Sequence, residues 1–150
     1  MKKIFLLAVL FLILISPTVT KAAANWVWVS SDDKTSIWID NNSIGRDSNG
    51  FFAYFKLTFS DAGRNSVIEH RRSHGLFVSG YDNLSSCIRF DYFKNSGGIK
   101  YNAFIESIDY DKNGNILDSY STNNFYWDRI IPKTIAEAEY NAAWARVRGK

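Results

Sequence analysis

The chain has 150 residues, with 18 Lys and Arg against 15 Asp and Glu, and a formal net charge of +3. Three of the basic residues, Lys2, Lys3 and Lys21, lie in the first 24 residues, so the remaining 126 residues carry 15 basic and 15 acidic side chains. A formally neutral domain without a Lys/Arg-rich run lacks the charge that phosphate backbones attract, which argues against a nucleic-acid partner. This length suits one domain with its own hydrophobic core.

Residues 1–24 have the pattern of a secretory signal peptide. A Lys2-Lys3 start precedes an apolar run over residues 4–15, and small residues follow this run as far as Ala24. The apolar run is shorter than the roughly 20 residues that a membrane-spanning helix needs. We therefore expect cleavage after Ala24 and a mature domain over residues 25–150 without a transmembrane segment. The expected location is the periplasm, the cell surface or the outside of the cell.

Most of the mature chain has a sequence pattern typical of antiparallel hairpins. Short segments rich in aromatic and β-branched residues alternate with turn residues. We predict strands at residues 26–29, 36–39, 51–59, 66–72, 86–93, 99–110 and 116–121. In the third strand the odd positions are all apolar, whereas Phe52, Tyr54, Lys56 and Thr58 fall between them. One face of this strand should therefore be buried, and the other should be partly wet and aromatic.

The pattern changes to helical spacing after Pro132. Thr134, followed three residues later by Glu137, predicts a capping box at a helix start. Tyr140 and Trp144 then recur on one helical face and should dock the helix on the sheet. The expected fold is α+β, an antiparallel, hairpin-rich β-sheet with one C-terminal α-helix packed on it.

Cys87 is the only cysteine in the sequence, so no intramolecular disulfide can form. An unpaired thiol in an exported protein is either buried and inert or available for an intermolecular bridge. The sequence leaves both alternatives for Cys87 open.

Two patterns match metal sites incompletely. His70 and His74 have the spacing of a zinc protease, but Arg71 stands where the catalytic Glu should follow the first His, and the segment is predicted as strand. Asp109 begins a calcium-loop pattern, but the twelfth position is Tyr120 instead of Glu. A hairpin turn explains the same residues. We expect no metal ion and no cofactor.

No catalytic motif stands out in the sequence. The chain lacks the Gly-x-Ser-x-Gly elbow of serine hydrolases and a glycine loop that would cradle phosphate. We therefore expect a protein that is not an enzyme. An enzyme with dispersed catalytic residues remains an alternative, because catalytic partners can be distant in sequence.

The mature chain contains more aromatic residues than one core face needs. They are Trp26, Trp28, Trp38, Phe52, Tyr54, Phe93, Tyr126 and Trp127. Aromatic side chains on a sheet face are typical of protein-binding surfaces, although a docked helix would cover them. We take Phe52 and Tyr54 as candidate contact residues. Arg71 and Arg72 either rim the same surface or keep an edge strand soluble.

The order of these signals resembles the surface-adhesin protein E family of small exported bacterial proteins. The matching segments are Trp26-Val27-Trp28-Val29, Ser36-Ile37-Trp38-Ile39-Asp40 with Ser43-Ile44, Cys87, Tyr110-Asp111-Lys112-Asn113-Gly114, and Trp127 ahead of Ile130-Ile131-Pro132, Thr134 and Glu137. The resemblance implies an antiparallel sheet with a C-terminal helix. It also implies adhesion to host matrix or serum proteins such as vitronectin, laminin and plasminogen.

The chain departs from the family in two respects. Family members usually tie the sheet cysteine to a second cysteine near the C-terminus, and this chain has no second cysteine. The namesake carries a lipid anchor, and the leader of this chain lacks the cysteine for lipidation. We expect an exported protein-binding module whose partner is a host extracellular matrix or serum protein. The alternative is a periplasmic or secreted small-ligand carrier or an enzyme. A deep apolar pocket with convergent polar groups would favour the carrier, and an exposed aromatic patch would favour the binding module.

Overall fold

The computed structural model describes residues 23–149, so all of the predicted signal peptide except Ala23 and Ala24 lies outside the described residues. An antiparallel sheet has the strand order β1-β2-β4-β5-β6-β7, with β3 beside β4 and β8 beside β6. The strands are β1 (Trp26–Ser31), β2 (Thr35–Asp40), β3 (Gly45–Arg46), β4 (Phe51–Phe59), β5 (Leu84–Ser96), β6 (Ile99–Asp111), β7 (Ile116–Ser121) and β8 (Asp128–Arg129). The predicted α+β class is confirmed.

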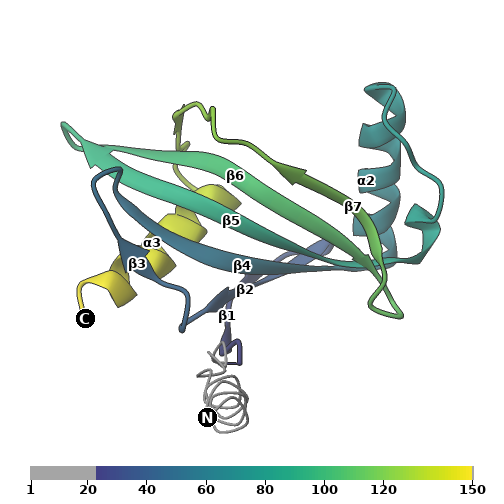
Figure 1. Cartoon of the computed structure of the whole chain (residues 1–150), viewed down its shortest axis with the longest axis horizontal. Helices are drawn as coiled ribbons and strands as arrows, with labels where there is room; N and C mark the ends of the chain where they lie inside the picture. Colours follow the sequence, from purple (N-terminus) through teal and green to yellow (C-terminus); the bar gives the residue numbers. More distant parts are fainter. Residues whose placement is uncertain (1–22, 150) are drawn as a thin grey trace, which may run out of the picture.

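Three helices accompany the sheet within the described residues. They are α2 (Asp61–Ser73), the short 3-10 helix η1 (Tyr81–Asn83) and the C-terminal α3 (Ile135–Val147). The helix α3 lies across one face of the sheet, while α2 stands at the far end of the strands (Figure 1). None of the helices within residues 23–149 has the length and apolar character needed to span a membrane.

The hydrophobic core lies between the sheet and α3. The odd positions Phe51, Ala53 and Phe55 of β4 are at most 3% exposed, as the alternation predicts. The ring of Tyr140 in α3 lies edge-on to that of Phe51, with centroids 5.1 Å apart. Phe93, one of the aromatic residues expected in excess of the core, is fully buried in this cluster. The helix therefore docks by its aromatic face, as predicted.

The start of α3 agrees with the sequence prediction, but the predicted capping box is wrong. The Thr134 hydroxyl donates to the Ile131 carbonyl (2.7 Å) and makes no bond to the helix. The Glu137 carboxylate accepts the backbone N–H of Lys133 and the ammonium group of Lys100, both at 2.8 Å. Glu137 therefore accepts the N–H of Lys133, whose φ is 64°, in place of that of Thr134.

The prediction of a strand over 66–72 is also wrong, because this segment forms the second half of α2. Ser60 is the N-cap, and its hydroxyl oxygen accepts the N–H of Gly63 at 3.1 Å. Gly63 lies so close to the backbone of Lys34 that a Cβ atom would stand 2.1 Å from the Lys34 carbonyl oxygen. The position of α2 therefore depends on its N-cap and on close contact with the β1–β2 turn. The spacing of apolar residues in the sequence predicts neither of these.

Candidate functional site: an aromatic cleft on the second face of the sheet

The second face of the sheet carries the even positions of β4. Phe52 and Tyr54 point to this face because successive side chains of a strand alternate, and both are half-buried. Their cross-strand partners in β5 are Tyr92 and Phe90, so aromatic side chains stand side by side on neighbouring strands. The structure confirms the predicted aromatic second face of β4.

These side chains continue into an aromatic row. In contact order the row consists of Tyr54, Phe90, Phe52, Tyr92, Phe125 and Trp127. Successive ring centroids are 4.7–5.9 Å apart, the spacing at which aromatic pairs attract. The ammonium group of Lys94 lies 4.1 Å from the ring centroid of Trp127 and ends the row with a cation–π contact.

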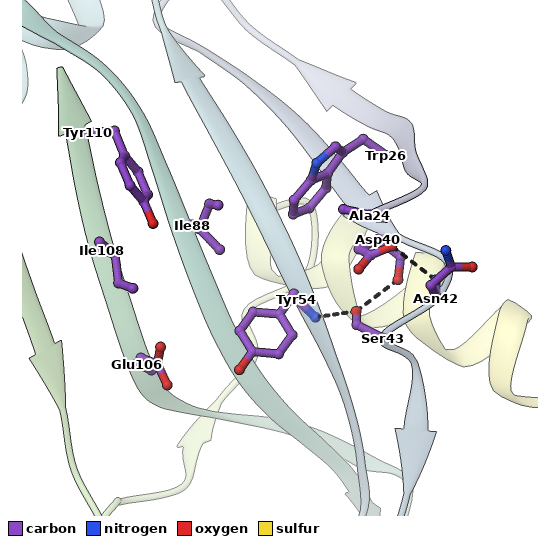
Figure 2. A pocket seen from close by; sticks show the side chains of 10 residues that line it. All are labelled: Ala24, Trp26, Asp40, Asn42, Ser43, Tyr54, Ile88, Glu106, Ile108 and Tyr110. Atoms are coloured by element: carbon purple, nitrogen blue, oxygen red, sulfur yellow. Dashed lines mark hydrogen bonds between the residues drawn. The ribbon is translucent and has the colours of Figure 1, made fainter. Parts of the chain in front are cut away.

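A cleft of about 570 Å³ adjoins the row at Tyr54 and is open to solvent. Its lining is Ala24, Trp26, Asp40, Asn42, Ser43, Tyr54, Ile88, Glu106, Ile108 and Tyr110 (Figure 2). Ile88 and Ile108 face each other across β5 and β6 and form an apolar floor. The volume is within the usual range of small-ligand pockets, roughly 300–1,000 Å³.

One end of the cleft is fixed by hydrogen bonds around Asp40. Its Oδ1 accepts the backbone N–H of Asn25 at 2.8 Å and that of Asn42 at 3.0 Å. The Ser43 hydroxyl donates to the Asp40 carbonyl (2.8 Å) and accepts the N–H of Tyr54 (2.9 Å). Figure 2 shows Asp40, Asn42 and Ser43 together beside Ala24 and Trp26. The polar side chains at this end are therefore held in place before any ligand arrives.

Glu106 supplies the other acidic group of the lining. It lies across from Phe90 in the β5–β6 register. Burial raises the pKa of Tyr54 above its ordinary value, and the carboxylate of Glu106 raises it further. The Tyr54 phenol therefore stays protonated at physiological pH. The ten lining residues include two carboxylates and no basic side chain, so the cleft combines apolar contact area with acidic and hydroxyl groups.

The two arginines taken as rim residues lie elsewhere. Arg71 and Arg72 are on α2, and Arg71 binds β7 through an ion pair of 2.6 Å with Asp118. Its guanidinium also lies 4.2 Å from the ring centroid of Tyr81. Arg72 is exposed. The structure does not bring either arginine to the face that carries Phe52, because α2 contacts the opposite face at the far end of the strands.

The residues weighed as metal ligands have other roles. His70 and His74 lie at the end of α2 instead of a strand end, with ring centroids 4.2 Å apart, and His74 Nδ1 lies 2.8 Å from the His70 carbonyl oxygen. Asp109 accepts the hydroxyl of Tyr81 at 2.6 Å. Within residues 23–149, no group of three or more His, Cys, Asp or Glu side chains is arranged to hold a metal ion.

Cys87 is buried on the covered face of the sheet. Burial raises the pKa of its thiol, and the carboxylate of Asp109 raises it further. The thiol is therefore protonated and shielded, which favours the inert alternative over an intermolecular bridge.

A second cluster of titratable groups lies beneath α3, and no pattern in the sequence predicted it. Arg89 binds Asp91 (Nε–Oδ2 2.7 Å) and Glu139 (Nη2–Oε2 2.5 Å). Both carboxylates are 1% exposed, and one oxygen of each has no hydrogen-bond partner. Burial raises the pKa of Glu139 to about 7. Because both carboxylates are enclosed, this cluster joins α3 to β5 and offers no surface to a ligand.

The cleft residues on β5 and β6 were also missed as a site. Ile88, Ile108 and Glu106 lie in predicted strands, but only the pairing register places them beside Tyr54. Comparison of the chain with protein-family models, curated proteins and solved structures finds no match. The function must therefore be inferred from the site itself and from the patterns in the sequence.

Proposed function

We propose that this chain is an exported module that binds another protein through the second face of its sheet, as an adhesin for a host extracellular matrix or serum protein. The observation that carries the proposal is the aromatic row with its adjoining cleft, on a face that α3 does not cover. Aromatic side chains that combine apolar area with polar tips supply much of the binding energy in protein interfaces. The leader pattern supports export, and the resemblance to surface-adhesin protein E supports adhesion.

The shape of the site suits a segment of a partner chain. The apolar floor of Ile88 and Ile108 accepts apolar side chains, and Trp26 and Tyr110 supply walls that can stack on them. The cleft opens beside Tyr54 onto the aromatic row, so a longer segment can continue over the row after filling the cleft. A partner bound in this way gains a buried anchor and a wider contact area together.

The alternative is a carrier of a small apolar ligand, and the volume of the cleft is the observation that favours it. Carrier pockets usually bury 70–90% or more of a drug-sized ligand. The cleft is open to solvent instead of enclosed, and it continues at Tyr54 into the aromatic row. An open cleft beside a wider aromatic surface favours the protein partner over the carrier.

The test is binding of the mature chain to immobilised vitronectin, laminin and plasminogen, measured by surface plasmon resonance. The double variant Phe52→Ser/Tyr54→Ser should weaken saturable binding at least tenfold, because it removes the centre of the row. The matched control is Phe104→Ser/Tyr120→Ser, which removes another stacked pair, 37% and 52% exposed, from the opposite face. This control should change the Kd less than twofold.

Three results would contradict the proposal. Equal loss in both double variants would show that the second face is not the contact surface. Loss of binding at moderate salt would show nonspecific adsorption, because contacts between apolar surfaces survive screening that shortens charge effects to about 8 Å at 0.15 M. Absence of binding to all three proteins, with a small molecule recovered from the purified chain, would establish the carrier.

A further inference from the structure

Asp40 at the end of β2 is a nearly buried carboxylate without a cationic partner. It is 9% exposed, and within residues 23–149 it takes part in no ion pair. Among the described residues, the donors to its Oδ1 are the neutral backbone N–H groups of Asn25 and Asn42. A buried carboxylate is stabilised much more by a positive charge than by neutral donors. The site is therefore suited to a cation at the position of one of these nitrogens.

One of the two nitrogens belongs to Asn25, the residue that follows the predicted cleavage site. Its backbone nitrogen lies 2.8 Å from Asp40 Oδ1. The position of this nitrogen is fixed from the C-terminal side, because the Asn25 carbonyl accepts the N–H of Asn41 at 3.0 Å and Trp26 pairs with Asp40 in the sheet. Cleavage of the preceding peptide bond therefore leaves the nitrogen where it is.

We propose that cleavage after Ala24 converts this neutral hydrogen bond into an ion pair between the α-ammonium group of Asn25 and the carboxylate of Asp40. A signal peptidase adds one water across the Ala24–Asn25 peptide bond, which leaves a carboxylate on Ala24 and an amine on Asn25. The amine takes up a proton at neutral pH, because α-amino groups titrate at about 8. The new positive charge lies next to the Asp40 carboxylate, which has no other cationic partner among the described residues. Processing therefore stabilises the contact between the start of β1 and β2.

Processing also changes the cleft. Ala24 is part of its lining, and the carbonyl of Ala23 accepts the side-chain amide of Asn42 at 2.7 Å. Figure 2 shows Ala24 beside Asp40 and Trp26 at this end of the cleft. Release of Ala23 and Ala24 widens the cleft mouth and frees the Asn42 amide for a ligand. The same cut therefore stabilises the terminus and opens the binding site.

The inference rests on the export and cleavage that the proposed function includes, so its test separates processing from ion pairing. The core residues all lie between Ile37 and Ala143, and the first strand begins at Trp26, so a chain starting at Asn25 keeps the whole sheet and α3. First, mass spectrometry of the exported protein should give residues 25–150. A different first residue would overturn the processing step.

Second, two forms of the chain, starting at Asn25 or at Ala23, are compared with and without Asp40→Asn by urea unfolding. The substitution should lower the folding equilibrium constant about tenfold more in the Asn25 form, because only that form has the ammonium group beside Asp40. The control is Asp47→Asn, which removes an exposed carboxylate that accepts the N–H of Asn49 and the hydroxyl of Tyr92. Its effect should be equal in the two forms.

Third, acetylation of the α-amine should be at least tenfold slower in the Asn25 form than in the Ala23 form, and Asp40→Asn should remove the difference. This rate reports the pairing of the amine even when the variant is less stable. Equal acetylation rates, or an equal effect of Asp40→Asn in both forms, would overturn the ion pair. Failure of the proposed function is recognised separately, because Phe52→Ser/Tyr54→Ser leaves both Asn25 and Asp40 in place.

Discussion

The two faces of β4 have similar residues and different environments. Phe51 and Phe55 point toward α3 and are buried, whereas Phe52 and Tyr54, their neighbours in the chain, point the other way and stay half-buried. Alternation along a strand alone separates the two pairs. An aromatic residue of β4 therefore stabilises the fold when its side chain points toward α3, and it forms the candidate binding surface when its side chain points the other way. Substitutions on the covered face should therefore lower stability, and substitutions on the second face should weaken binding.

The largest expected effect comes from the charged cluster on the covered face. Arg89→Ala leaves Asp91 and Glu139 buried without a cation, which should lower the free energy of unfolding by roughly 3–5 kcal/mol. Urea unfolding measures this change. The control Arg72→Ala removes an exposed arginine from α2 and should cost within about 0.5 kcal/mol. A similar, small cost for both variants would show that the cluster does not hold α3 to the sheet.

The sequence predicted the elements of the covered face well, because each of them shows a regular spacing of apolar residues. Predicted strands coincide with β4 and β7, and helical spacing located α3 at its observed start. The segment 66–72 was assigned wrongly because α2 is a largely polar helix. Its structure depends on the Ser60 cap and on contact of Gly63 with Lys34, and the sequence pattern carries no information about that contact.

The candidate site was less predictable than the fold. Phe52 and Tyr54 could be placed on the second face from the alternation of side chains along the strand alone. The cleft needs the register of three strands, including the irregularity in the β5–β6 pairing at Phe90/Asp91, and a single sequence does not determine register. Asp40 was recognised only as part of a motif, because its burial arises from the packing of distant segments.

The next effect is a pH dependence of stability that arises on the covered face. Burial raises the pKa of Glu139 from its ordinary value of 4.5 to about 7. Between these pH values the folded chain keeps a proton that the unfolded chain has released, so the free energy of unfolding falls as the pH rises through this window. The full change is about 3 kcal/mol for one carboxyl group, and stability from this group levels off above pH 7.

Glu139→Gln should remove this slope, because glutamine cannot ionise and still offers Arg89 an oxygen. Urea midpoints at pH 4.5, 5.5 and 7.5 provide the measurement. The control is Glu137→Gln, since the ammonium group of Lys100 holds the pKa of Glu137 below its ordinary value. The control should retain the falling slope. A slope that persists in Glu139→Gln would assign the titration to Asp91, whose pKa burial also raises.

The smallest effect compares two tryptophans on opposite faces. Trp144 in α3 is half-buried, with its ring centroid 5.3 Å from that of Phe51, and it packs against the core cluster beneath the helix. Trp144→Ala should therefore lower the free energy of unfolding by about 2 kcal/mol, below the 3–5 kcal/mol of a fully buried aromatic residue. Trp28→Ala removes a tryptophan that is 54% exposed on the second face and should cost under about 1 kcal/mol. Urea unfolding of both variants gives the comparison. A larger cost for Trp28 than for Trp144 would show that the second face contributes to the stability of the fold, and the division between a stabilising face and a binding face would then be wrong.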